Sequence, residues 1–181
     1  GADVLLVLNA SPFHLGKQQQ RIQIMRANVC KFGLPGVYAN LTGGQDELVF
    51  DGASFVLDAD GNVMASAPHF EEAVLVVEFV DGVPQPGERT VEPKQEALAY
   101  SALVLGVRDY IGKNGFPGAL IGLSGGVDSA LTLAVAVDAI GAERVRAVMM
   151  PSQYTSQMSL DDASELASAL GVRYEVLPIK P

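Results

Sequence analysis

Basic side chains are scarce in this sequence of 181 residues, which has 12 lysines and arginines against 21 aspartates and glutamates. The formal net charge is therefore -9 at pH 7. A surface of this sign repels the phosphate backbone of DNA or RNA, so we expect no nucleic-acid partner. Apolar residues make up 49% of the chain, which is enough for packed cores and indicates a globular protein.

Cysteines and long apolar runs are also nearly absent. The one cysteine, Cys30, cannot form an internal disulfide, which is consistent with a reducing cytoplasm. The longest wholly aliphatic run, residues 4–8, is far shorter than the roughly 20 residues of a membrane-spanning helix. Asp3 stands where a secretory signal would be basic. We therefore expect a cytoplasmic protein without a membrane segment.

The first half of the sequence alternates short apolar segments with turns. A helix is predicted over residues 18–32, because Ile22, Met25 and Val29 recur at helical spacing. Cys30, which follows Val29, is expected to be a small buried side chain of this helix. Strands are predicted at residues 4–8, 37–41, 48–50, 54–57, 63–66 and 74–79.

The composition changes at residues 81–94, a stretch of Gly, Pro and polar residues that is typical of a linker. It separates a first domain, residues 1–80, from a second, residues 95–181. Both ends of the sequence run directly into strand-like segments, and no methionine precedes the first one. We therefore expect this sequence to be an internal fragment of a longer protein.

The second half has a different rhythm, in which strands and helices alternate. An amphipathic helix is predicted over residues 95–111, with Tyr100, Leu103, Val107 and Ile111 on one face. Another helix is predicted to begin at Ser159, with Asp162 completing a capping box. A helix at residues 129–140 and strands at 119–123, 145–150 and 172–177 complete the pattern. This order predicts a parallel sheet with right-handed crossovers.

One strand-to-helix turn has the composition of a phosphate-binding loop. In open parallel sheets, ligands bind beyond the carboxyl ends of the strands, where this turn lies. Paired glycines allow close approach of the backbone, the N–H groups that begin the next helix point at an anion, and the hydroxyls of Ser124 and Ser129 are expected to add donors. Asp128 is unfavourable beside phosphate unless a cation intervenes, so we assign it to Mg2+. The predicted ATP site consists of Gly122, Leu123, Ser124, Gly125, Gly126, Val127, Asp128 and Ser129.

Other motifs compete for the same turn. Neither Walker A nor GxGxxG matches, because no lysine follows the glycines and their spacing differs. Residues 122–126 do satisfy GxSxG, the nucleophile elbow of serine hydrolases. That mechanism needs a histidine later in the chain, whereas His14 and His69 both precede Ser124. Within this chain the hydrolase interpretation fails, although further sequence after it could supply the histidine.

The string SGGVDS at residues 124–129 resembles the N-type ATP pyrophosphatases, which include NAD, GMP and asparagine synthetases. The wider sequence resembles glutamine-dependent NAD synthetases in particular, in which a nitrilase-type glutaminase precedes the synthetase. The segments that carry this resemblance are residues 9–17, 43–52, 100–110, 150–156 and 158–163. The resemblance covers essentially the whole chain.

The resemblance implies an α/β fold: the C-terminal part of an α-β-β-α nitrilase-like sandwich, then the N-terminal part of a doubly wound parallel-sheet ATP pyrophosphatase domain. It implies a carbon-nitrogen ligase that uses ATP and Mg2+ to adenylate the carboxylate of deamido-NAD, releases pyrophosphate, and amidates the adenylate with ammonia from glutamine. Another pyrophosphatase-type amidotransferase, or a fragment that binds ATP without turnover, remains an alternative.

By position in the family, Ser11 and Lys17 contact glutamine, whereas the Glu, Lys and Cys of the amidase triad lie upstream of residue 1. The fragment by itself is therefore expected to be inactive, and the parent enzyme is expected to be a homo-oligomer with small-molecule substrates. Gln153 stands where relatives often carry Arg, which removes one possible phosphate contact. Cys30 is not expected to replace the missing nucleophile.

Three features have simpler interpretations. The acidic set Asp46, Glu47 and Asp51 is expected to be a solvated loop, with some chance of shaping the amidase pocket. Residues 58–62 are expected to form a hairpin turn rather than a calcium loop. For His14, orienting a ligand and simple packing are equally favoured.

Overall fold

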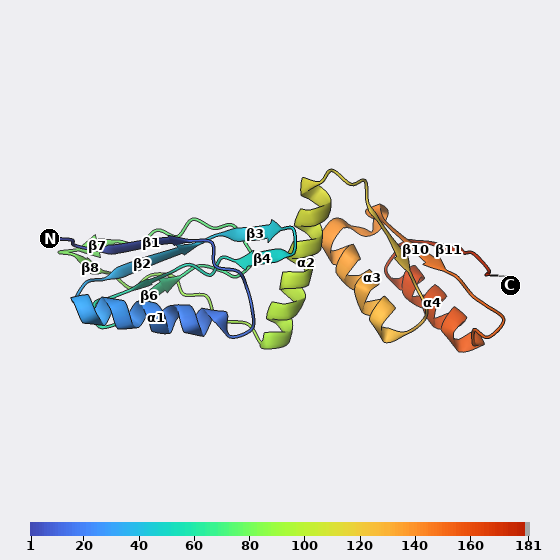
Figure 1. The fold of residues 1–181 in the computed structure, drawn as a ribbon, viewed down its shortest axis with the longest axis horizontal. Helices are drawn as coiled ribbons and strands as arrows, with labels where there is room; N and C mark the ends of the chain where they lie inside the picture. The colour runs from blue at the N-terminus through green and yellow to red at the C-terminus, as the bar shows by residue number, and fades with distance from the viewer. Residues whose placement is uncertain (180–181) are drawn as a thin grey trace. The chain divides into compact units, whose positions relative to one another are not determined.

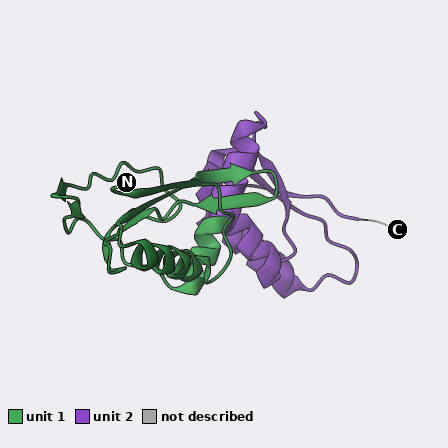
Figure 2. Ribbon diagram, turned by 60° about the vertical axis from the view of Figure 1, so that its left-hand side comes forward, with its two compact units in different colours: residues 1–102 green, residues 103–181 purple. Residues whose placement is uncertain are grey.

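The computed structural model describes residues 1–179. The chain divides into two compact units, Gly1–Ala102 and Leu103–Pro181 (Figure 2). No helix among the described residues has the length and apolar character that crossing a membrane would require.

The first unit is built on a four-stranded sheet with the order β1-β2-β5-β6. Strands β1 and β2 are parallel, and the other two pairings are antiparallel. Helix α1 lies along this sheet (Figure 1) and buries Met25 and Val29 with Tyr38, Phe55 and Leu57. The elements of the sheet and its helix are β1 (Leu5–Asn9), α1 (Lys17–Phe32), β2 (Gly36–Asn40), β5 (Phe55–Leu57) and β6 (Val63–Ser66).

Two hairpins complete the first unit. They are formed by β3 (Thr42–Gln45) with β4 (Leu48–Asp51), and by β7 (Phe79–Val80) with β8 (Val83–Pro84). The predicted strand at residues 74–79 is wrong, since only its last residue is in a strand, and Val74 and Val76 are largely exposed. Strand β3 went unpredicted because two of its four residues are glycines, which disfavour strands until a partner fixes them.

The second unit contains a three-stranded parallel sheet with the order β11-β10-β9. Its core joins Leu123 and Leu133 to Ala147 on the sheet and to Ala163 and Ala167 on the last helix. The elements are α2 (Gln95–Lys113), within which the division of the chain falls, β9 (Ala119–Gly122), α3 (Val127–Ile140), a 3-10 helix (Ala142–Arg144), β10 (Val145–Met149), α4 (Gln157–Ala169) and β11 (Arg173–Val176). The predicted alternation of strands and helices is confirmed.

Two predicted details of the second unit are wrong. On the predicted face of α2, Ile111 is buried, but Leu103 is 53% exposed and Leu105 is buried instead. Helix α2 is apolar around much of its circumference, so its sequence does not specify one face. Helix α4 begins after Ser156, whose side chain accepts a hydrogen bond from the N–H of Ser159. The sequence contains two serines three residues apart, and the true cap is the earlier one.

Candidate functional site

The predicted phosphate loop connects β9 to α3 at the carboxyl end of the parallel sheet. Leu123 is buried beneath the loop, and its N–H donates to the carbonyl of Val148 on β10. Gly126 caps α3 with extended backbone angles. The first N–H groups of this helix have no intrahelical acceptors, so the loop ends in a set of donors suited to an anion.

The two serines of the loop hold its shape. Ser129 Oγ donates to the carbonyl of Gly126 at 2.9 Å and accepts from the N–H of Ser124 at 3.1 Å. The hydroxyls of Ser124 and Ser129 lie 3.0 Å apart, and Ser124 Oγ accepts from the N–H of Gly126. Because the Ser129 hydrogen is used on Gly126, the hydrogen of Ser124 is the one that joins the two hydroxyls. Both hydroxyl hydrogens are thus used inside the loop.

Gly125 is required by its surroundings as well as by its backbone. Its φ is +79°, in the left-handed region that favours glycine. A Cβ atom at this position would also collide with the backbone of Ser159, in the first turn of α4. The loop therefore packs directly against the start of α4, which brings the N-terminal ends of α3 and α4 to the same edge of the sheet.

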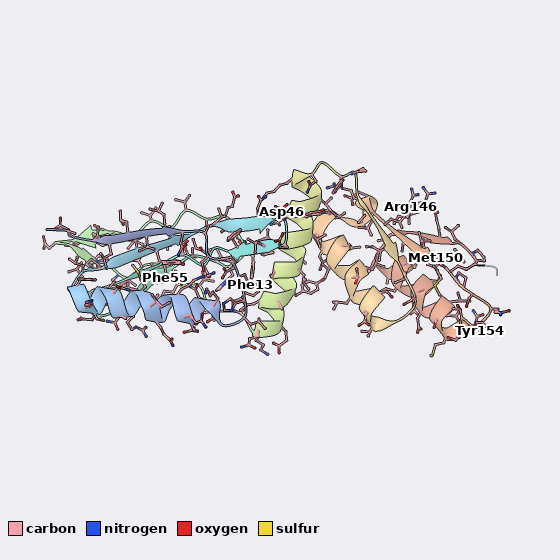
Figure 3. The ribbon with its side chains drawn as sticks, in the orientation of Figure 1. Phe13, Asp46, Phe55, Arg146, Met150 and Tyr154 are labelled. Atoms are coloured by element: carbon pink, nitrogen blue, oxygen red, sulfur yellow. The ribbon has the colours of Figure 1, made fainter. Side chains whose placement is uncertain are left out.

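The segment between β10 and α4 lies beside the loop. Met150 and Tyr154 mark it in Figure 3, and both side chains are more than half exposed. The Met150 methyl group would lie 3.6 Å from a Cβ atom on Gly122. Gln153, in the same segment, is exposed. This segment offers apolar and aromatic surface next to the loop at residues 122–129.

Asp128 is an exposed residue in the first turn of α3. Its backbone carbonyl accepts from the hydroxyl of Thr132 at 2.9 Å. Within residues 1–179, its carboxylate takes part in no ion pair or side-chain hydrogen bond. It is therefore free to accept a cation beside a bound phosphate.

In the first unit, Ser11 and Lys17 line one cavity of about 480 Å³ together with Gln20 and Arg21. Ser11 lies in the segment after β1, and Lys17 is the first residue of α1. The remaining walls come from β1, β2 and α1 and are mainly apolar, with Leu5, Leu6, Val7, Asn9, Ile24, Met25, Asn28, Phe32 and Tyr38. The structure thus brings the two predicted glutamine-binding residues to one cavity.

Hydrogen bonds hold both the backbone N–H and the backbone carbonyl of Ser11. The N–H of Ser11 donates to Asn40 Oδ1 at 2.9 Å, and its carbonyl accepts from Arg21 Nη2 at 2.7 Å and from Asn40 Nδ2 at 3.3 Å. Further along, Phe13 packs edge-on against Phe70 with ring centroids 5.2 Å apart (Figure 3 labels Phe13). The segment is therefore an ordered wall of the cavity.

The expectation of a solvated acidic loop is wrong for Asp51, which is buried. Asp46 and Glu47 are exposed, but Asp51 is 1% exposed and forms an ion pair with Arg21 at 2.8 Å. His69 Nδ1 lies 3.6 Å from its other oxygen. Burial raises the pKa of Asp51, but the contacts with His69 and Arg21 lower it by more, so the pKa lies below its ordinary value of 3.8.

Sequence reasoning missed Arg21 and Asn40. Arg21 lies on the same face of the predicted helix as the buried Met25 and Val29. A charged residue on a buried face indicates that it is paired with a partner of opposite charge. The partner, Asp51, is 30 residues away, and no local pattern connects the two.

The other singled-out residues lie outside the cavity. Cys30 is exposed rather than buried, because it falls one residue past the buried stripe of α1 that ends at Val29. His14 is exposed, and its Nδ1 contacts the carbonyl oxygen of Leu15. This contact gives no support for a role in orienting a ligand. The turn after β5 is confirmed, since Asp58 accepts from the backbone of Asp60 and Asn62 before β6.

Comparisons with known proteins match two different families to the two halves of the chain. Residues 1–83 match the family model for carbon-nitrogen hydrolases, and residues 99–181 match the one for NAD synthases. The chain is therefore similar to a carbon-nitrogen hydrolase in its first half and to an NAD synthase in its second half. The α/β fold class expected from the sequence is confirmed.

Curated relatives match the chain across both segments. The glutamine-dependent NAD(+) synthetase of Rhodobacter capsulatus is 48% identical over 99% of this chain, and that of Acinetobacter baylyi is 45% identical over 99%. The chain spans about a third of the length of these relatives, 33% and 34%. The expected resemblance to glutamine-dependent NAD synthetases is confirmed.

Solved structures give the same result. The glutamine-dependent NAD+ synthetase of Acinetobacter baumannii, in complex with ADP, superposes with a TM-score of 0.95 and 47% identity over 98% of this chain and 34% of that one. The enzyme of Cytophaga hutchinsonii, at 19% identity and a TM-score of 0.81 over 96% of this chain and 36% of that one, shares the fold.

Proposed function

We propose that the protein containing this chain makes NAD from deamido-NAD, ATP and glutamine. The observation that carries the proposal is the order of two segments, a match to carbon-nitrogen hydrolases followed by a match to NAD synthases that includes the loop at residues 122–129. Relatives with both segments over 99% of this chain are named glutamine-dependent NAD(+) synthetases. In this proposal, residues 1–80 belong to the amidase domain, 81–94 are the linker and 95–181 belong to the synthetase domain.

The loop has a defined task in this reaction. A carboxylate is a poor electrophile, and its conversion to a mixed anhydride with AMP supplies a good leaving group for ammonia. The N–H groups at the start of α3 would stabilise the charge of the departing pyrophosphate. Asp128 would hold Mg2+, which neutralises phosphate charge when bound. Residues 122–129 would together bind ATP.

The cavity of the first unit would bind glutamine through Ser11 and Lys17. A hydroxyl and an ammonium group both donate to the carboxylate of an amino acid. Cys30 does not line this cavity, so the proposal assigns none of the described residues as the amidase nucleophile. We further propose a cytoplasmic homo-oligomer with small-molecule substrates and without nucleic-acid or membrane partners.

The test uses the protein as the cell makes it, with Mg-ATP, deamido-NAD and either glutamine or ammonia. We expect NAD with equimolar AMP and pyrophosphate from both nitrogen sources. Formation from ammonia alone would remove the amidase half of the proposal. Absence of pyrophosphate under every condition would leave a module that binds ATP without activating a carboxylate.

Asp128→Ala should lower pyrophosphate and NAD formation by about 100-fold or more, since the loss of a bound metal removes several kcal/mol of charge stabilisation. Asp162→Ala is the control, because Asp162 is also an exposed carboxylate on a helix of the same unit, in the second turn of α4. It should leave both rates unchanged. Equal losses in the two variants would refute the role of Asp128.

The serine-hydrolase alternative is tested on Ser124. A nucleophilic serine donates its hydrogen to a base, whereas the Ser124 hydroxyl is joined to Ser129. A fluorophosphonate probe should leave Ser124 unlabelled, and labelling would restore that alternative.

A further inference from the structure

Arg21 makes an unusual set of contacts for a residue that no motif includes. It is 4% exposed and forms five hydrogen bonds, one for each N–H of its guanidinium group. Two acceptors, Gln18 Oε1 and Asp51 Oδ2, lie at Nη1. The other three acceptors belong to the Ser11 segment: Ser11 Oγ, Ser11 O and Pro12 O.

The bond from Arg21 Nε to Ser11 Oγ, 3.2 Å long, decides what the serine hydroxyl can do. A hydroxyl group has one hydrogen and two lone pairs. Arginine cannot accept, so it occupies a lone pair of Ser11 and leaves the hydroxyl hydrogen for another acceptor. Ser11 lines the cavity, and an acceptor bound there can receive this hydrogen.

Asp51 holds the guanidinium group of Arg21 in the position from which it donates to Ser11. Its Oδ2 accepts a hydrogen bond of 2.8 Å from Arg21 Nη1, and its Oδ1 lies 2.8 Å from Arg21 Nη2 in an ion pair, so both oxygens restrain the guanidinium group. Asp51 is itself 1% exposed and lies at the end of β4. The hairpin of β3 and β4 thereby determines the orientation of a side chain on α1.

We propose that Arg21, held by Asp51, is a positioning residue for glutamine: it orients the Ser11 hydroxyl as a hydrogen-bond donor into the cavity. The inference rests on the proposed function, which supplies glutamine as the occupant. Arg21 acts through Ser11. Lys17, which lies one helical turn before Arg21 on α1, lines the same cavity.

Arg21→Lys is the informative substitution in the protein as the cell makes it. Lysine keeps the positive charge beside Asp51, but its three N–H donors are all on one nitrogen atom. It therefore lacks the planar guanidinium group with which Arg21 donates to Ser11 and Asp51 at the same time. The KM for glutamine should rise about tenfold or more, as expected for a lost hydrogen bond to a charged group. The rate with ammonia, which bypasses the cavity, should stay within about twofold.

Arg26→Lys is the matched control. Arg26 also lies on α1 and donates from Nε, but to the carbonyl of Gly61 at 2.8 Å, away from the cavity. Neither its glutamine KM nor its ammonia rate should change. An unchanged glutamine KM in folded Arg21→Lys, or a rise of equal size in Arg26→Lys, would overturn the inference while leaving the proposed function intact.

A double-mutant cycle tests whether Arg21 acts through the hydroxyl of Ser11. In the Ser11→Ala background, Arg21→Lys should raise the glutamine KM by much less than in the native protein, because the oriented hydroxyl is gone. Full additivity would contradict the positioning role. If Arg21→Lys does not fold, Asp51→Asn provides the same test, and a folded Asp51→Asn protein with a native glutamine KM would refute the proposal.

Assays of the native protein distinguish a failure of the proposed function from a failure of the positioning role of Arg21. Use of both glutamine and ammonia supports the proposed function and makes the variant kinetics decisive. Use of ammonia without glutamine would remove the amidase half, and the positioning role of Arg21 would fall with it.

Discussion

The two candidate sites are both loops that follow a parallel strand, yet they are held together differently. In the second unit, the loop at residues 122–129 is closed by hydrogen bonds among Ser124, Gly126 and Ser129, all within six residues of one another. In the first unit, the Ser11 segment is held by Arg21 and Asn40, which lie 10 and 29 residues away. One loop is restrained locally and the other by distant elements.

This difference determines how each loop should respond to change. A locally closed loop depends on its own glycine and serine residues, whereas a loop closed by distant side chains depends on a buried charge pair. Substitutions should therefore damage the two units separately, and the size of each effect should follow the burial of the groups involved.

The largest effect is expected for Asp51→Ala. It would leave Arg21 buried without its carboxylate, which costs about 3–5 kcal/mol. Amide hydrogen exchange should show lost protection at residues 9–21 and 42–51, with residues 119–140 unchanged. Asp60→Ala, which removes an exposed carboxylate of the same unit, is the control. Loss of protection in both units would contradict the separation.

Acid should weaken the same ion pair without mutation. The pKa of Asp51 is lower in the folded state than its ordinary value of 3.8, so the unfolded chain binds the proton more tightly. The stability that this residue contributes is present above pH 3.8 and is lost as the pH falls through the folded-state pKa. Protection of residues 9–21 should decline in that window, and Asp51→Asn should remove this component of the decline.

A smaller effect is expected for Gly125→Ala in the second unit. A side chain at a φ of +79° costs about 1–3 kcal/mol in strain, and its Cβ would press on the backbone of Ser159. Pyrophosphate release should fall by about 10- to 100-fold, whereas glutamine hydrolysis should not change. Gly112→Ala, where open space surrounds the helical glycine, should be tolerated. Equal losses at both positions would contradict the packing argument.

The smallest effect distinguishes two possible caps of α4. Ser156→Ala should lower the stability of the second unit by about 1 kcal/mol, because Ser156 accepts the N–H of Ser159. Asp162→Ala should change stability by less than about 0.5 kcal/mol, as is usual for exposed positions. Thermal unfolding of the two variants checks the order, and a larger loss for Asp162→Ala would restore the capping box.

Much of the fold could be predicted because its signals are local. The helices at α1 and α3, and the parallel strands β9 and β10, follow from apolar spacing and from glycines at their ends. The prediction at residues 74–79 failed because an apolar run resembles a strand whether or not a partner is present, and β3 was missed because its pairing with β4 overrides the poor strand propensity of two glycines.

The sequence by itself determined the shape of the loop at residues 122–129, since the residues that shape it are consecutive and their hydrogen bonds span at most five positions. It also determined which family the chain resembles. Only the tertiary structure decided that Asp51 is buried, that Cys30 is exposed, and that Arg21 reaches Ser11. The physical reason is that a buried charge is stable only beside its partner, and the fold brings Asp51 to Arg21 from 30 residues away.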